Sequence, residues 1–524
     1  MSSDSKLKKV VRDPVHGYIK IETDIMSQII DTEHFQRLRR IEQTNMRCVY
    51  PSARHDRFIH SIGTYHLAKT AVKALIQNAE ENIKECSLYP NKDILKCLFF
   101  NFEIAALLHD VGHAPFSHTL EAFFAYQKVN NELFQIQEIL IQRMDKSGIN
   151  YSQNFIEDLK FAKPNPHEVV SCIVIADKFK NIIENLGQKR NCIIDFEFIF
   201  RCILGAPYST TLGKYRDFRN CIIQLLNSAT IDIDKLDYIT RDSQISGYDN
   251  IVIDTKRLLE SLNIVLYKNI EGKEQFCIVF EKQAISIIHN VLDARNSLYL
   301  WIYAHHKVKY EAHMIEKSLY VIAEKEKKDF LYELFSIEQL EENLLCDDNI
   351  WQLFQKHKSD SIIQELFCRN QQKKALWKSF AEFQILFATE TEMEVGAFSL
   401  IKMRKFFEEY FDNKIDNVRQ KEDVKEEFMK YLETYFGNHG ITPKEYEIVF
   451  NKIKLSGVIP NTIIVRVKGR LFSFDSLIKD IYKDSKVGSF FYLYISQDKR
   501  DDINMQELVT YIKSYSRFKI QPEI

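Results

Sequence analysis

The chain of 524 residues carries 71 Lys and Arg against 73 Asp and Glu, which gives a formal net charge of -2. Its 45% apolar and 27% charged residues are typical of a globular protein with several domains. The near-neutral charge argues against a protein that coats nucleic acid through bulk electrostatics, although it allows a local basic groove.

Neither the N-terminal segment nor the cysteines indicate export. Residues 1–9 are polar and basic with no apolar stretch behind them, so no secretory signal is predicted. The ten cysteines include no C-x-x-C pair, which in so long a chain favours reduced thiols over a disulfide framework. We therefore predict a cytoplasmic protein that does not associate with membranes.

Helical periodicity dominates the first part of the chain. Residues 1–330 contain four segments in which apolar residues recur at spacings of three and four: Ile25–Ile41, Ile62–Ile76, Ile94–His109 and Val169–Ile183. Asn263–Lys268 and Gln275–Phe280 flank a Gly-containing turn and predict a β-hairpin. A long helical pattern follows at Ala284–Glu324.

The later part of the chain changes character twice. Residues 331–440 predict a charged helical extension. Residues 441–524 predict a small α+β lobe with strands at Tyr446–Ile453, Asn461–Val467 and Ser489–Ile495 and a helix at Asn504–Tyr515. The predicted fold class is therefore mostly α, with a helical core at 1–330 that contains the small hairpin.

Histidine is concentrated near the N-terminus, where nine of the 15 lie within the first 167 residues. An apolar run leads into adjacent His109 and Asp110, and Gly112 and Pro115 then end the helix. A His-Asp pair at a helix end can direct both side chains toward one point, and imidazole with carboxylate suits Zn, Fe, Mn, Co or Ni better than Mg or Ca. We therefore predict a metal or catalytic role for this pair.

Several ordered motifs over residues 9–320 resemble the HD-domain deoxynucleoside triphosphate (dNTP) triphosphohydrolases, the family of the vertebrate SAM-and-HD-domain enzyme and its bacterial relatives. They are Asp13-Pro-Val-His16-Gly, Ile30-Asp31-Thr-Glu-His-Phe-Gln36-Arg-Leu-Arg39, Arg57-Phe-Ile-His60, His109-Asp-Val-Gly-His113-Ala-Pro-Phe-Ser-His118, Asp232-Ile-Asp-Lys-Leu-Asp-Tyr238 and Arg295-Asn-Ser-Leu. The resemblance implies an all-helical HD-domain core. No SAM domain is expected, since the first motif begins near residue 10.

In this family water attacks the α-phosphorus of a dNTP, and the products are a deoxynucleoside and triphosphate. By resemblance, one divalent transition metal per subunit (Fe, Mn, Zn, Co or Ni) is held by four residues: His60, His109, Asp110 and Asp234. An additional Mg²⁺ with the substrate triphosphate is allowed. His118 resembles the general acid, and Glu121, one helical turn on, would hold its imidazole. His113, His167 and Glu168 complete the implied catalytic set.

The resemblance also implies substrate and activator sites. The substrate set comprises Gln43, Arg57, Lys235, Tyr238, Asp242, Arg295 and Tyr303. The residues that resemble a guanine-reading activator site between subunits are Lys9, Asp31, Gln36, Arg39 and Lys282. We therefore expect a dNTP substrate, GTP or a dNTP as activator, and a homo-oligomer, a tetramer by analogy.

Two other readings remain open from the sequence. Another HD activity, such as a phosphodiesterase or nucleotidase that acts on a signalling nucleotide, would use the same metal ligands. A non-catalytic module that senses nucleotides or binds nucleic acid would keep the fold without turnover. The nature of the products separates the first alternative from the dNTPase, and turnover separates the second.

Overall fold

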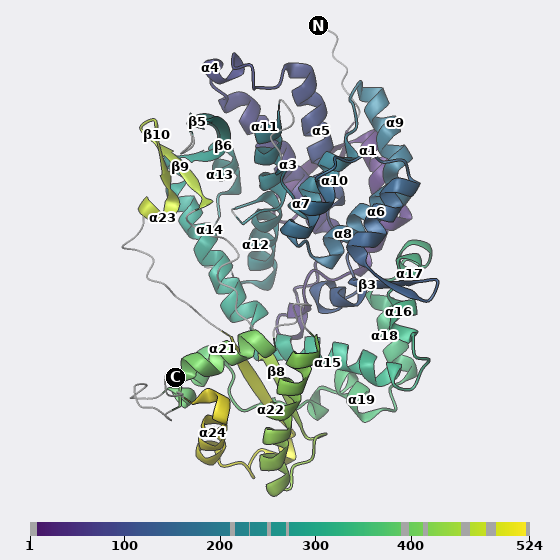
Figure 1. Ribbon diagram of the computed structural model, residues 1–524, viewed down its shortest axis with the longest axis vertical. Coiled ribbons are helices and arrows are strands. Elements are labelled where there is room, and N and C mark those ends of the chain that lie inside the picture. The colour runs from purple at the N-terminus through teal and green to yellow at the C-terminus, as the bar shows by residue number, and fades with distance from the viewer. Residues whose placement is uncertain are drawn as a thin grey trace. The chain divides into compact units, whose positions relative to one another are not determined.

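The chain was studied as a computed structural model that describes residues 8–209, 215–229, 231–248, 253–268, 272–388, 398–411, 418–451, 462–477 and 489–519. Helices predominate among these residues, and the strands form only small sheets (Figure 1), which confirms the predicted mostly-α fold class. The chain divides into two units. The first unit comprises 1–298, 322–353 and 456–483, and the second comprises 299–321, 354–455 and 484–524.

Both units are built from segments that are discontinuous in sequence. The structure thus groups the chain differently from the three consecutive segments 1–330, 331–440 and 441–524, and that three-part division stays a prediction. Within 441–524, residues 456–483 group with the first unit and the flanking residues with the second.

Capping side chains fix where the helices of the first unit begin. Asp56 accepts from the Ile59 amide at 3.0 Å, and Asp232 accepts from the Lys235 amide at 2.8 Å. The helices of this unit that bear on the site or its support are α3 (Arg57–Asn78), α5 (Lys92–Leu108), α6 (Ile136–Lys146), α8 (Pro166–Val174), α9 (Lys180–Arg190), α10 (Phe196–Leu204), α11 (Arg216–Leu226), α12 (Ile233–Ser246), α13 (Thr255–Glu260), α14 (Ile285–Ser297) and α17 (Ile337–Glu342).

Helices α3 and α12 approach each other closely at Gly63. A Cβ built on Gly63 would lie 2.8 Å from Asp237 Cγ and closer still to the Asp237 carboxylate and the Arg241 guanidinium. Glycine is therefore required here by space, and it lets α12 bring its acidic face against α3.

We predict that Gly63→Ala lowers the free energy of unfolding by about 1–3 kcal/mol, because the overlap outweighs the higher helix propensity of alanine. Gly437→Ala is the matched control, since Gly437 lies in α22 (Val418–Asn438) and its Cβ would meet nothing within 4 Å. Thermal unfolding of both variants provides the measurement. Equal stabilities for the two variants would contradict this view of the α3–α12 contact.

The described strands of the first unit form three small sheets. Strand β1 (Lys8–Asp13) pairs with β2 (Gly17–Glu22) in an antiparallel hairpin. The predicted hairpin is confirmed as β5 (Leu262–Lys268) and β6 (Glu274–Glu281), although Glu271 of its turn lies outside the described residues. Strand β9 (Ile464–Val467) joins β6 in parallel and pairs with β10 (Arg470–Ser473). The first unit also contains the short hairpin β3 (Tyr126–Val129) and β4 (Glu132–Gln135).

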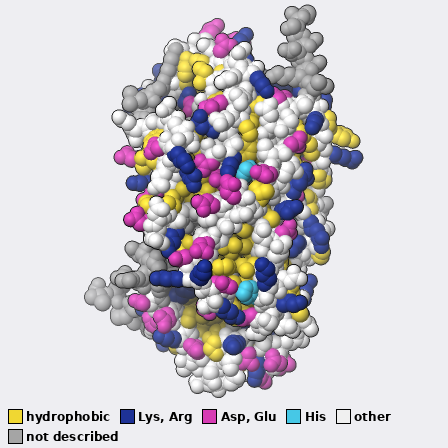
Figure 2. Space-filling view, turned by 90° about the vertical axis from the view of Figure 1, so that its right-hand side faces the viewer, with side chains coloured by type: hydrophobic (Ala, Val, Ile, Leu, Met, Phe, Trp, Pro, Cys, Tyr) yellow, Lys and Arg dark blue, Asp and Glu magenta, His cyan; other side chains and the backbone are white. Residues whose placement is uncertain are grey.

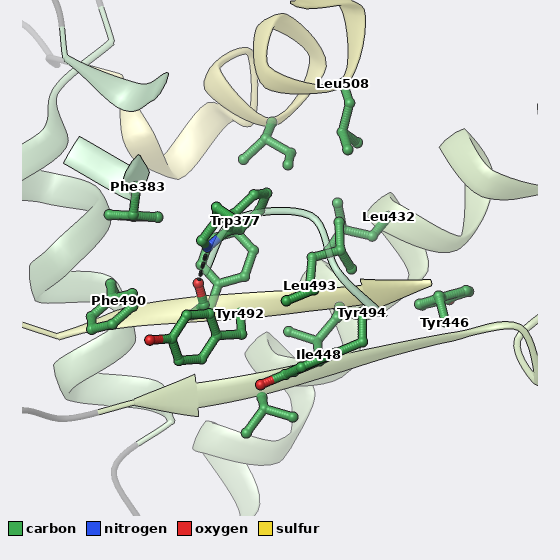
Figure 3. Close-up of a cluster of buried hydrophobic side chains, with 14 of the residues drawn as sticks. Trp377, Phe383, Leu432, Tyr446, Ile448, Phe490, Tyr492, Leu493, Tyr494 and Leu508 are labelled. Carbon is green, nitrogen blue, oxygen red and sulfur yellow. Dashed lines mark hydrogen bonds between the residues drawn. The ribbon is translucent and has the colours of Figure 1, made fainter. Parts of the chain in front are cut away.

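Aromatic side chains fill the core of the second unit (Figure 3). Strand β11 (Phe490–Ile495) is buried along its whole length and lies between β8 (Tyr446–Asn451) and β7 (Lys374–Ala375). Trp377 is fully buried and donates from its indole nitrogen to the Phe491 carbonyl at 2.6 Å. The helices of this unit are α15 (His306–Ala323), α19 (Ser361–Phe367), α20 (Phe380–Phe387), α21 (Leu400–Tyr410), α22 and α24 (Met505–Lys513).

Three of the predicted helices are interrupted. Val169–Ile183 is divided by a π-helical segment at Ile175–Phe179, which separates α8 from α9. The segment Ile25–Ile41 is a series of short turns, because Thr32 ends one turn and caps the next by accepting from the Phe35 amide. The pattern at Ala284–Glu324 is split after Tyr303, where a wide turn at Leu298–Tyr303 separates α14 from α15. Apolar periodicity does not register such breaks, since both sides of each break still bury apolar residues.

The described helices include no candidate membrane span, and the face drawn in Figure 2 has no dominant charge. Among the described residues, no helix is both long enough and apolar enough to cross a bilayer. On the face in Figure 2, Lys and Arg side chains are interspersed with Asp and Glu. This mixture agrees with the near-neutral net charge.

Candidate active site

The predicted metal ligands converge in the first unit from three separate helices. His60 lies in α3, His109 and Asp110 follow α5, and Asp234 lies in the first turn of α12. Asp234 Oδ1 lies 3.0 Å from His60 Nε2 and 3.7 Å from His109 Nε2. Asp110 carboxylate oxygens lie 3.6 Å from each of the same two nitrogens. The four residues thus meet at one point, although His60 and Asp234 are 174 positions apart in the sequence.

Hydrogen bonds on the other side of each imidazole direct the ring nitrogens toward this point. His60 Nδ1 lies 2.7 Å from Asp237 Oδ2, and His109 Nδ1 lies 2.9 Å from the Ala106 carbonyl. In both rings Nε2 is buried and has no hydrogen-bond partner among the residues that the structure describes. A carboxylate or carbonyl at Nδ1 with a lone pair at Nε2 is the arrangement of metal-ligating histidines.

The charges around His60 favour a cation. Burial disfavours its imidazolium, yet the adjoining carboxylates of Asp234 and Asp237 raise the pKa of His60 to about 10. Burial likewise disfavours the Asp234 carboxylate, but His109 and His60 hold its pKa well below the usual range. A metal ion would satisfy the same carboxylates and both buried nitrogens. The residues therefore fit a divalent metal, and the Asp234 side chain, 36% exposed, marks the open side of the site.

A buried polar network supports His60 from behind. Asp237 Oδ1 lies 2.6 Å from His16 Nε2, and Arg241 donates to both Asp237 oxygens at 2.8 and 2.9 Å. Arg241 also donates to Asp13 Oδ2 at 2.8 Å. Asp13 and His16 come from the first motif, for which the sequence indicates no role. The position of Asp237, one helical turn after Asp234, was the available signal for its role.

We predict that Asp237→Asn weakens metal binding by about 10- to 100-fold, because an amide cannot hold His60 in the ligating tautomer as the carboxylate does. Equilibrium dialysis with metal analysis measures this affinity. Asp195→Asn is the control, since Asp195 caps α10 and pairs with Arg219 instead. Equal metal affinity in Asp237→Asn and the parent would contradict the assigned role.

A second cluster contains the predicted acid and its neighbours. His118 Nδ1 lies 3.1 Å from Glu121 Oε1, and His167 Nδ1 lies 2.6 Å from Glu121 Oε2. The ring of His113 stacks on that of His167 with 4.2 Å between centroids. Burial disfavours the imidazolium of His167, but Glu121 raises its pKa to about 9. Burial and the Arg57 charge lower the pKa of His113 well below its ordinary value.

Backbone strain positions His118 at the edge of this cluster. Phe116 and Ser117 adopt positive φ angles of 54° and 52°, a conformation that costs non-glycine residues about 1–3 kcal/mol each. Asp347 accepts from the Phe116 amide at 2.7 Å, and the Ser117 hydroxyl donates to the Glu42 carbonyl. These bonds hold the turn so that the His118 side chain remains 59% exposed.

Glu168 has hydrogen-bond partners other than the predicted catalytic histidines. It accepts from the Asn165 amide at 2.7 Å in a capping box at the start of α8, and from Asn227 Nδ2 at 3.0 Å. Its hydrogen bonds therefore fix the N-terminus of the helix that carries His167. Its catalytic role stays a prediction.

The substrate set is brought together only in part. Arg57 donates to Asp110 Oδ2 at 2.8 Å, Lys235 pairs with Asp232, and Asp242 lies 2.6 Å from His55 Nε2. The first contact joins Arg57 to the metal cluster and the second joins Lys235 to the N-terminus of α12. The third gives His55 a partner that the sequence did not indicate. The remaining members are Gln43 and Arg295, which are buried, Tyr238, which is half-buried, and Tyr303, which lies in the second unit.

The predicted activator residues form two pairs in the first unit. Lys9 Nζ lies 3.8 Å from Asp31 Oδ2, and Arg39 Nε donates to Gln36 Oε1 at 2.9 Å. Lys9, Asp31 and Arg39 are exposed, and Lys282 is exposed in the turn after β6. Exposed charges of this kind are available to a ligand, and their nucleotide-binding role stays a prediction.

Comparison with known proteins identifies relatives for part of the chain. An uncharacterised protein of Methanocaldococcus jannaschii is 29% identical over 59% of this chain and 49% of its own length. The deoxynucleoside triphosphate triphosphohydrolases SAMHD1 of Mus musculus and Danio rerio are 30% and 27% identical, each over 57% of this chain and 42% of their own length. No family model matches.

These similarities support the resemblance to HD-domain dNTP triphosphohydrolases that the motifs indicate, and the relatives include uncharacterised archaeal and bacterial proteins. The chain spans about half, or less, of the length of the curated relatives just compared. A hypothetical protein from Aquifex aeolicus matches 96% of this chain and 99% of its own with a TM-score of 0.55 and 18% identity, which shows a shared fold.

Proposed function

We propose that the protein is a metal-dependent hydrolase that converts dNTPs to deoxynucleoside and inorganic triphosphate. The observation that carries this proposal is the pair of adjoining clusters: two buried imidazole nitrogens facing Asp110 and Asp234, and His118 and His167 held by Glu121. The first cluster fits a transition metal, and the second fits proton donation and phosphate binding. Relatives named as dNTP triphosphohydrolases support the same substrate class.

A metal ion held by His60, His109, Asp110 and Asp234 would acidify a water molecule and polarise an α-phosphate oxygen. Glu121 orients His118 so that its exposed imidazole can protonate the departing 5′ oxygen. His167, kept protonated by the same carboxylate, would donate to a phosphate oxygen. The metal is Fe, Mn, Zn, Co or Ni by donor chemistry, with Mg²⁺ accompanying the triphosphate.

Regulation forms the second part of this proposal. GTP or a dNTP would bind at Lys9, Asp31, Gln36, Arg39 and Lys282 and promote assembly to a homotetramer. Asp accepts from guanine N1 and N2, and Arg donates to O6 and N7, so the exposed side chains match guanine. Such an enzyme would act in the cytoplasm, in dNTP pool control or in defence against phage.

A product screen tests the activity. The metal-loaded protein is incubated with each dNTP and NTP, alone and in pairs, with Mn²⁺ or Fe²⁺, and the products are separated by chromatography. We expect deoxynucleoside and triphosphate in equal amounts. Release of orthophosphate or a linear dinucleotide would instead support another HD hydrolase, and absence of turnover would support a sensing module.

Sedimentation with and without nucleotide tests the assembly. We expect GTP or a dNTP to shift the protein to a larger species and to raise the hydrolysis rate together. A rate and a sedimentation profile that no nucleotide changes would contradict the regulatory part while leaving the hydrolase assignment in place.

A further inference from the structure

The second cluster has the donor set of a metal site in its own right. His113, His118 and His167 each offer one ring nitrogen, and these three atoms lie within 4.8 Å of one another. The ring centroids are 4.2, 5.0 and 5.2 Å apart. The residues come from the loop after α5, from the strained turn at Ser117–Thr119 and from the first turn of α8, so the fold assembles them from three places.

One carboxylate prepares two of these rings as ligands. The two oxygens of Glu121 each face an Nδ1 atom, at 3.1 Å in His118 and 2.6 Å in His167. When Nδ1 donates a hydrogen bond to a carboxylate, a cation that displaces the Nε2 proton finds a lone pair on that nitrogen. Glu121 thus orients the His118 and His167 rings through Nδ1, as Asp237 orients the His60 ring.

His113 supplies the independent observation. It is 0% exposed, and neither of its ring nitrogens has a hydrogen-bond partner among the described residues. Burial removes the water that would hydrogen-bond to the imidazole nitrogens, and no protein hydrogen bond offsets this desolvation cost. A cation bound by His113, His118 and His167 would satisfy it, and the exposed side chain of His118 leaves the cation a path from solvent.

We propose that His113, His118 and His167 form a second metal site, selective for a borderline divalent ion such as Zn²⁺, whose occupation inhibits hydrolysis. A three-histidine set with an open fourth position suits Zn²⁺ and Co²⁺, whereas Mg²⁺ prefers oxygen ligands. Occupation engages the lone pair of His118 Nε2, so this ring no longer delivers a proton. The inhibition rests on the proposed function, whereas the metal binding does not.

Metal stoichiometry tests the site without reference to activity. The full-length protein, stripped of metal, is titrated with Co²⁺ in equilibrium dialysis, and four-coordinate Co²⁺ is followed by its visible absorption. We expect two equivalents in the parent and one in His118→Ala, with binding at the second site weakened by at least about 100-fold. Asp234→Ala should keep the three-histidine equivalent. His289→Ala removes a histidine that pairs with Asp293 and serves as the control, with two equivalents.

His113→Ala provides a second variant, and thermal unfolding of both variants reports whether each is folded. A parent that binds a single equivalent, or a His118→Ala variant that binds two, would overturn the site.

The inhibition is tested by activity measurements. Hydrolysis of dNTPs should fall over the concentration range in which the second equivalent of Zn²⁺ binds, and excess Mg²⁺ should not reproduce the fall. Full binding with undiminished hydrolysis would overturn the inhibition. Full binding in a protein that never hydrolyses dNTPs would leave the site standing and overturn the proposed function.

Discussion

Replacing Asp234 with alanine is expected to abolish metal binding at the His60–His109 cluster and to reduce dNTP hydrolysis by a factor of about 10³ or more. Asp234 Oδ1 faces both buried Nε2 atoms, so its removal takes away the carboxylate that the two imidazoles share. Metal analysis of the purified variant and a product assay measure the two effects. Asp293→Ala, which removes a half-buried carboxylate that pairs with His289, is the control.

Asp110→Ala should lose the same activity and also unfold more easily. Arg57 is 4% exposed and donates to Asp110 Oδ2, so the alanine variant leaves a buried guanidinium without its carboxylate. Breaking such a pair costs about 3–5 kcal/mol. Asp234→Ala with full metal content, or Asp110→Ala with parental stability, would contradict the roles assigned to these carboxylates.

The second large effect concerns the proton donor. His118→Ala should lower kcat by about 10²- to 10⁴-fold, the usual contribution of a general acid, while the metal at His60, His109 and Asp234 stays bound. The His118 ring is exposed, so its loss should leave the fold intact. Steady-state kinetics measures this loss, and Asp234→Ala differs from His118→Ala because it also loses the ion at the His60–His109 cluster. Parental kcat in His118→Ala would exclude His118 as the acid.

Glu121→Gln should change the pH profile in a defined direction. Glu121 raises the pKa of His167 to about 9 against the effect of burial, so the protonated imidazole is lost only as pH rises through that value. The amide removes the charge, so the alkaline limb of kcat/KM should move to lower pH. An unchanged alkaline limb would show that the Glu121 charge does not set this ionisation.

The sequence indicated the candidate metal ligands, which the structure brings together, but not the residues that support them. His60, His109, Asp110 and Asp234 converge because their motifs place each at a helix end or on a helix face. Asp237 and His16 were quoted within motifs but given no role, since which carboxylate faces His60 Nδ1 depends on how α12 lies against α3. That packing depends on Gly63. A single glycine within a predicted helix does not indicate, from one sequence, that another helix approaches it closely.

Glu168 and Arg57 illustrate a different limit. Their positions in the motifs suggested catalysis and phosphate binding, yet the structure gives Glu168 a capping box and Arg57 a buried pair with Asp110. A motif fixes where a side chain lies along the chain, and its hydrogen-bond partners follow only from the assembled fold. The sequence also could not show that residues 456–483 group with the first unit, because strand pairing between β6 and β9 joins segments about 190 residues apart.

Hydrolysis of a dNTP in ¹⁸O-labelled water tests the central claim most directly. Attack of water on the α-phosphorus with departure of the 5′ oxygen places one ¹⁸O in the released triphosphate and none in the deoxynucleoside. Mass spectrometry of both products should show this pattern for the parent and no product above background for Asp234→Ala. Label in orthophosphate, or in the 5′ hydroxyl of the deoxynucleoside, would contradict the account.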